Sequence, residues 1–140
     1  MILTLHHYRD RIEAGQVLAR QLAPYASRVD TLVLALPRGG VPVAAEVAAY
    51  LNAPLDAFLV HKLGAPENPE LALGALASGG VRVLDEGAIV ESGISPEELA
   101  HVTMLENAEL MRLEQLYRGS QPPPRIAGRV VIVVADGITS

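Results

Sequence analysis

The chain has 140 residues, of which 50% are apolar and 4% aromatic, and its formal net charge is −5. This length predicts one domain over residues 1–140, and the acidic charge argues against a nucleic-acid binder. The absence of cysteine excludes disulfides, thiolate metal ligands and a cysteine nucleophile. We see no signal peptide and no apolar run long enough to span a membrane. We therefore expect a cytoplasmic protein without a membrane or nucleic-acid partner.

The first predicted element is a helix that starts at Asp10 and ends near Pro24. Asp10 is a good N-cap residue, and Glu13 follows it at the spacing of a capping box. Ile12, Leu18, Ala19 and Leu22 fit an amphipathic helix.

The next segments predict a strand, a helix and a second strand. Residues 31–36 form a continuous apolar run, which is typical of a strand buried on both faces. Alanine-rich residues 41–51 predict a helix, and residues 55–60 predict the second buried strand. This order is that of a βαβ unit, so we predict a parallel sheet.

The middle of the chain is less regular. We interpret residues 61–73 as a loop, because glycine and proline interrupt every apolar pattern there. Residues 73–77 and 81–84 flank a Ser-Gly-Gly sequence, which predicts a β-hairpin. Residues 85–95 carry no clear signal.

A long helix is predicted over residues 96–117. Ser95 is the expected N-cap, Glu98 completes a capping box, and Gly119 ends the helix. We expect the helix to pack through an apolar stripe formed by Leu99, Val102, Leu105, Leu113 and Leu116.

The valine-rich run over residues 130–134 predicts a central strand of the parallel sheet. The fold class predicted is therefore α/β: a three-layer α/β/α domain with a central parallel sheet and a small antiparallel hairpin. No covering helix follows this strand before the chain ends at Ser140. We therefore expect a domain that is incomplete at its C-terminus and that self-associates, as a homo-oligomer, through its exposed apolar surface.

Each predicted buried strand is followed by a loop that could bind a ligand, since ligands bind at the carboxyl ends of parallel strands. The first loop is Pro37-Arg38-Gly39-Gly40. Paired glycines let backbone N–H groups approach an anion, and the next helix starts there. A plain strand-to-helix turn explains the same residues.

The second loop carries Lys62, the only lysine of the chain, directly after His61. Its ammonium group could reach a phosphate, although an exposed surface lysine explains it equally well. His61 has no second histidine or carboxylate at a zinc-ligand spacing, so we predict no directly bound metal there.

The third loop holds Asp136, Gly137, Thr139 and Ser140. A carboxylate followed by glycine and hydroxyl residues suits a sugar phosphate: the acid accepts hydrogen bonds from sugar hydroxyls, while N–H and O–H groups hold the phosphate. The alternative is a simple Asp-Gly turn.

Taken together, the three loops resemble the type I phosphoribosyltransferases, and in particular predicted members that occur alone or fused to hydrolases. The resemblance covers nearly the whole chain in the same order. It is carried by Tyr8-Arg9-Asp10-Arg11, by Leu36 to Val41, by His61 to Pro66 with Pro69 to Ala75, and by Val131 to Ser140.

The resemblance implies transfer of the 5-phosphoribosyl group from 5-phosphoribosyl 1-pyrophosphate (PRPP) to a small nitrogenous acceptor, with release of pyrophosphate. Magnesium is the implied cofactor and would arrive with PRPP. Arg38, Gly39 and Gly40 would form the pyrophosphate loop, and the segment after Lys62 would be a mobile hood. Lys62 and Asp136 would be the catalytic residues.

By the same resemblance, substrate-binding residues would be Arg38, Gly39, Gly40, Lys62, Asp136, Gly137, Thr139 and Ser140, with Asp136 also able to reach the magnesium. The chain departs from the family pattern, because Ala135 replaces the first of two adjacent acids. The ending at Ser140 also removes the helix expected to hold the 5′-phosphate. We therefore expect weak or no PRPP affinity. We keep as alternatives a non-catalytic PRPP- or nucleotide-sensing module and an inactive fragment that assembles with a partner.

Overall fold

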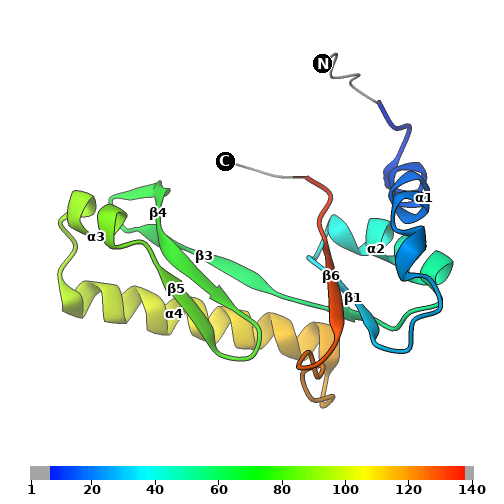
Figure 1. Cartoon of the computed structure of the whole chain (residues 1–140). Helices are drawn as coiled ribbons and strands as arrows, with labels where there is room; N and C mark the ends of the chain where they lie inside the picture. Colours follow the sequence, from blue (N-terminus) through cyan, green and yellow to red (C-terminus); the bar gives the residue numbers. More distant parts are fainter. Residues whose placement is uncertain (1–6, 138–140) are drawn as a thin grey trace. The chain divides into compact units, whose positions relative to one another are not determined.

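The computed structural model describes residues 7–137, which fold into two compact units (Figure 1). One unit combines residues 7–57 with residues 124–137, and the other comprises residues 58–123. None of the helices in the described part of the chain is both long and apolar enough to cross a membrane.

The first unit contains the predicted parallel sheet. Strands β1 (Thr31–Ala35), β2 (Leu55–Ala57) and β6 (Val130–Val134) are arranged in the order β2-β1-β6, and both pairings are parallel. The sheet confirms the predicted βαβ unit. The predicted central position of the valine-rich strand is wrong: β1 is central, and β6 is an edge strand among the described strands. All five residues of β1 are buried, as its two neighbours and continuous apolar sequence require.

Two helices and a short 3₁₀ turn complete this unit. Helix α1 (Arg11–Gln21) starts as predicted, because the Asp10 carboxylate accepts a hydrogen bond from the Glu13 N–H at 2.8 Å. The turn η1 (Ala23–Tyr25) follows, and helix α2 (Gly40–Leu51) connects β1 to β2. Alanine and valine side chains pack α2 against the sheet and α1, and the most buried of them are Ala19, Val33, Ala35, Ala44, Val47 and Val134.

The second unit is built on an antiparallel sheet of strands β3 (Val60–Ala65), β4 (Asn68–Ala77) and β5 (Val81–Leu84), in the order β3-β4-β5. The predicted hairpin is confirmed as β4–β5. The loop predicted over residues 61–73 is wrong, because β3 and most of β4 occupy it. Gly64 suggested a loop because it interrupts the apolar pattern, but it lies inside a strand, at a bulge in the β3–β4 register. A Cβ there would come within 2.8 Å of the Pro69 carbonyl oxygen.

The second predicted strand of the parallel sheet is shorter than residues 55–60, since β2 ends at Ala57 and Val60 begins β3.

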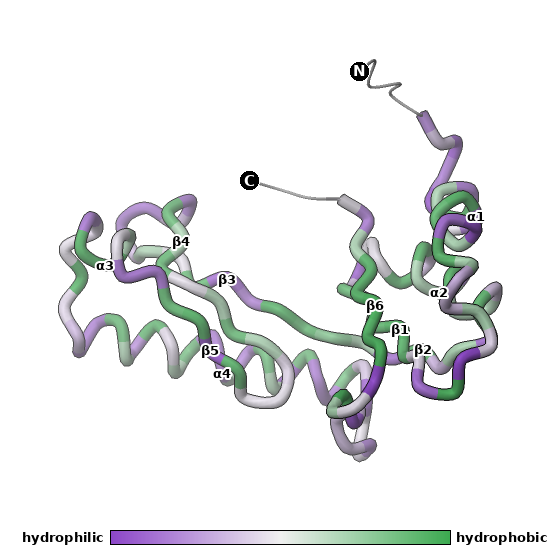
Figure 2. Tube along the Cα trace, viewed as in Figure 1, coloured by the Kyte–Doolittle hydropathy of each residue, from purple (hydrophilic) through white to green (hydrophobic). Residues whose placement is uncertain are grey.

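Helices α3 (Glu86–Ser92) and α4 (Pro96–Arg118) cover this second sheet, and α4 runs along it in Figure 1. The capping box between Ser95 and Glu98 is present, as predicted. The apolar stripe differs from the prediction: Leu110 is buried, whereas Leu105 and Leu116 are exposed. At about 100° per residue, Leu110 falls on the same side of the helix as Leu99, and Leu105 does not. Figure 2 shows the resulting alternation of apolar and polar residues along α4.

The α/β class, the parallel sheet with its helices and the separate antiparallel hood are therefore confirmed, and the hood is larger than a hairpin. It has three strands, two helices and a core of its own, whose most buried members are Leu59, Leu63, Leu73, Leu76 and Leu110.

A buried hydroxyl gives a test of the hood structure. Ser78 is 6% exposed, and its Oγ accepts a hydrogen bond from the Leu59 N–H at 2.9 Å. Because Ser78→Ala leaves that buried N–H without a partner, we expect it to lower the free energy of unfolding by about 1–3 kcal/mol in urea denaturation. Ser120→Ala, at an exposed serine after α4, is the control and should change it by less than about 0.5 kcal/mol. Equal stability of the two variants would contradict this account.

Candidate functional site

The predicted first and third loops meet at the carboxyl ends of β1 and β6, which lie side by side in the parallel sheet. Strand pairing places Ala35, the last residue of β1, opposite Val134, the last residue of β6. The Leu36 N–H then donates to the Val134 carbonyl at 2.9 Å, and the Gly40 N–H donates to the Leu36 carbonyl at 3.0 Å. The parallel register therefore fixes the loop after β1 against the end of β6.

The two glycines of the first loop are required by this contact. A Cβ at Gly40 would lie 2.6 Å from the Val134 carbonyl oxygen, and a Cβ at Gly39 would lie 1.8 Å from Oδ2 of Asp136. Gly39 has ordinary helical dihedrals, so glycine is needed there for space and not for an unusual backbone angle. The Asp136 carboxylate thus lies directly on the backbone of Gly39.

The carboxylate of Asp136 is also held by Arg11, at the start of α1. Nε and Nη2 of Arg11 donate to the same oxygen, Oδ2 of Asp136, at 3.1 and 2.7 Å. This hydrogen-bonded guanidinium lowers the pKa of Asp136 below its usual value, so the acid is ionised at neutral pH. The sequence prediction of the site missed Arg11. Its only signal was its place in the Tyr8-Arg9-Asp10-Arg11 motif, because no local spacing links residues 125 positions apart.

A groove of about 420 Å³ opens beside this carboxylate within the first unit. Its walls are largely apolar and come from α1, α2 and β6, with Tyr8 and Asp136 as its polar members. The lining residues include Ala14, Leu18, Val43 and Val133. The site thus combines an ionised acid, two backbone glycines and an adjoining apolar surface.

Of the other residues predicted for this site, the structure describes Arg38 and Gly137. Arg38 and Gly137 are next to Gly39 and Asp136 in the chain, and the peptide bond between Pro37 and Arg38 is cis. Thr139 and Ser140 lie outside the described residues. The structure therefore brings together five predicted residues: Arg38, Gly39, Gly40, Asp136 and Gly137.

Lys62 belongs to the second unit, on strand β3. Its side chain is half-exposed, and Nζ lies 4.0 Å from the Glu70 carboxylate on β4. An exposed ion pair at this distance contributes little to folding stability. The ammonium group of Lys62 is accessible because its side chain is half-exposed. Lys62 and the cluster around Asp136 therefore belong to different units of the chain.

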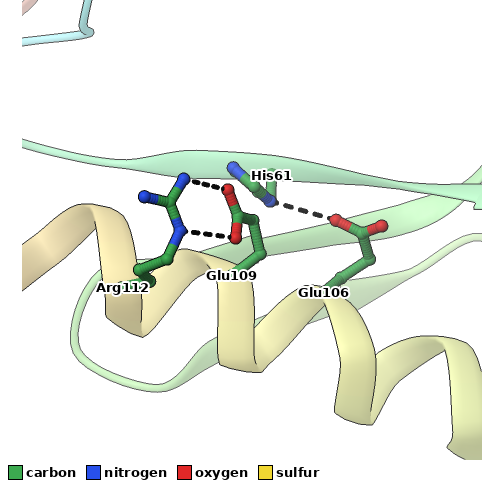
Figure 3. Close-up of polar contacts among 4 residues, drawn as sticks. All are labelled: His61, Glu106, Glu109 and Arg112. Carbon is green, nitrogen blue, oxygen red and sulfur yellow. Dashed lines mark hydrogen bonds and ion pairs between the residues drawn. The ribbon is translucent and has the colours of Figure 1, made fainter.

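His61, the neighbour of Lys62, faces helix α4 (Figure 3). Its Nδ1 lies 3.1 Å from a carboxylate oxygen of Glu106, while Glu109 pairs with Arg112 on the same helix. The hydrogen bond from Arg112 lowers the pKa of Glu109. These contacts tie β3 to α4 and account for His61 without a ligand. Among residues 7–137, no three histidine or acidic side chains gather into a group that could hold a metal ion.

Comparison with known proteins identifies the family. No family model matches the sequence. Two curated proteins of Mycobacterium tuberculosis, from strains CDC 1551 / Oshkosh and ATCC 25618 / H37Rv, are 41% identical to the chain over 133 residues, which is 95% of its length. Both carry the name "Putative phosphoribosyl transferase". The chain belongs to the phosphoribosyltransferase family.

The chain is also similar to a solved structure. The crystal structure of TT1426 from Thermus thermophilus matches 92% of the chain with a TM-score of 0.77 and 41% sequence identity. The chain spans 61% of that protein and about 30% of the curated mycobacterial relatives. The phosphoribosyltransferase likeness thus extends through both compact units of the chain.

The close contacts of the two glycines predict different effects of alanine. Gly40→Ala places its methyl group against backbone atoms of β6, which cannot move independently, so we expect a loss of about 1–3 kcal/mol in the free energy of unfolding. Gly39→Ala meets a side chain that can swing away, so we expect a smaller loss together with displacement of Asp136 from Arg11.

Denaturation and the NMR signal of the Asp136 carboxyl carbon measure these two effects. Gly137→Ala is the structural control, because its Cβ would meet nothing within 4 Å. A Gly39→Ala variant with an unchanged Asp136 signal would contradict the described contact.

Proposed function

We propose that the edge formed by the ends of β1 and β6 is the pyrophosphate- and ribose-binding part of a PRPP site, and that the protein acts as a phosphoribosyltransferase of type I. The observation that carries this proposal is the seating of the Asp136 carboxylate on Gly39. This contact brings a carboxylate that can accept hydrogen bonds from sugar hydroxyls next to a backbone turn that can bind an anion. A ribose with an attached pyrophosphate requires both groups at one place.

Each residue has a role in this proposal. The Gly39–Gly40 backbone and the start of α2 approach the pyrophosphate, whose negative charge is favoured at a helix N-terminus. The guanidinium of Arg38 pairs with a phosphate group in a bidentate manner. Asp136, ionised at neutral pH, accepts hydrogen bonds from ribose hydroxyls. Lys62, which belongs to the hood unit, is the further cation that the family resemblance assigns to the phosphate charge.

The chemistry that these groups support is a substitution at the anomeric carbon. The bond from that carbon to the pyrophosphate oxygen breaks with its electron pair, and a nitrogen of the acceptor forms the new bond and releases a proton. Positive charge develops on the ribose, and negative charge develops on the leaving group. Fixed cations and backbone N–H groups therefore accelerate the reaction by stabilising the charge that forms.

Magnesium fits this site as an ion bound together with the substrate. Asp136 supplies one exposed carboxylate, and Mg²⁺ is commonly held by one or two carboxylates together with substrate phosphates. The ion would neutralise pyrophosphate charge. Asp136 is the residue able to reach it.

The residue before Asp136 favours a second candidate function. Ala135 is exposed at the position where the family pattern has another acid. A site with one acid instead of two suits binding of PRPP or a nucleotide without turnover. Release of pyrophosphate in the presence of nucleobase acceptors separates the two functions, since only the transferase produces it.

Two partial ligands test the proposed binding roles separately by NMR titration. Pyrophosphate with magnesium should shift the amide signals of Gly39 and Gly40, and Arg38→Gln should weaken this binding. Binding of ribose 5-phosphate should depend on Asp136. Because a charge-assisted hydrogen bond contributes about 1.5–3 kcal/mol, Asp136→Asn should weaken the binding of this sugar phosphate about tenfold or more.

Charge-matched controls are Arg20→Gln and Glu91→Gln, at exposed positions of α1 and α3. NMR also detects affinities near 1 mM, which correspond to about −4 kcal/mol. The proposal fails if neither ligand perturbs the Gly39–Gly40 signals in the folded protein, or if both controls weaken binding as much as the site variants.

A further inference from the structure

We propose that Arg11 is a positioning residue of the proposed PRPP site, which orients the Asp136 carboxylate on Gly39 for the ribose. This inference rests on the proposed function and assigns a role to a residue of α1. It is carried by the geometry of three groups that come from distant parts of the sequence: the start of α1, the turn after β1 and the end of β6.

The carboxylate of Asp136 is confined from two sides. Arg11 directs two hydrogen bonds at Oδ2, and the Cα of Gly39 lies against the same carboxylate group. Two donors on one oxygen fix the direction of the acid more strictly than one donor does. Oδ1 takes no part in this pairing, so it is the atom that we assign to the sugar hydroxyl.

Charge alone does not explain the pair. Both side chains are partly exposed, at 58% for Arg11 and 37% for Asp136, and exposed ion pairs contribute little to folding stability. The contact of Arg9 with Glu13 is of that ordinary kind, since it is exposed and local: it joins the residue before the N-cap Asp10 to the first turn of α1. The pair of Arg11 instead joins two elements at the predicted site. Orientation of the acid is the property that such a contact can supply.

The surroundings of Asp136 make this role testable. Arg11 is its partner on α1, Tyr8 shares the adjoining groove, and Arg38 neighbours Gly39 in the turn. Since Arg11 supplies both hydrogen bonds to Oδ2, its removal should leave the Asp136 carboxylate free to rotate away from Gly39.

The experiment compares Arg11→Gln, Arg11→Lys and the matched control Arg9→Gln, with ribose 5-phosphate and pyrophosphate as probes. We expect Arg11→Gln to weaken ribose 5-phosphate binding about threefold to tenfold and to leave pyrophosphate binding within about twofold. Arg11→Lys keeps the charge but loses the fork geometry, so it should restore part of the affinity. Arg9→Gln should match the wild type with both probes.

The NMR signal of the Asp136 carboxyl carbon, recorded at neutral pH without any ligand, gives the second measurement. A changed signal in Arg11→Gln, but not in Arg9→Gln, supports the positioning role. An unchanged signal overturns it, and so does tighter sugar binding by Arg11→Gln, which would make the pair an obstacle to the ligand. If the wild type binds neither probe, the proposed function fails, whereas the carboxyl signal still shows whether Arg11 holds Asp136.

Discussion

The parallel pairing of β1 with β6 is the constraint on which the candidate site depends. The register brings the ends of the two strands level, and the turn after β1 then has no space for a side chain at Gly39 or Gly40. A shift of one residue would turn the valine side chains of β6 to the opposite faces of the sheet. It would also separate Asp136 from Gly39. The burial that stabilises the sheet therefore also sets the geometry of the site.

Local patterns in the sequence were sufficient for the elements with strong end signals. The caps at Asp10 and Ser95 and the apolar run of β1 all describe short-range chemistry, and each predicted the correct element. The hood was underestimated because glycine and proline lie inside its strands, at a bulge that only the pairing of β3 with β4 explains. Strand order was also beyond local patterns, since the valine content of β6 says nothing about which strand lies at the edge.

The candidate site could be predicted from the sequence only where its residues directly follow a predictable strand. Arg38, Gly39 and Asp136 were predicted as site residues because each follows a buried strand, and the structure places the loops that carry them next to each other. Arg11 follows none, and its partner is distant in sequence, so only the folded chain reveals the pair. Lys62 lies on the separate hood unit, and its part in the site stays a prediction, as do the homo-oligomer, the cytoplasmic location and the acceptor.

The central position of β1 also bears on how the first unit opens. Its backbone is paired with β6 over all five residues and with β2 at Val33–Ala35, and every one of its side chains is buried. We therefore expect slower hydrogen exchange at its amides than in β6, whose outer edge has no partner among the described strands. By this expectation, the turn at Gly39 follows the slower-exchanging strand and Asp136 follows the faster one.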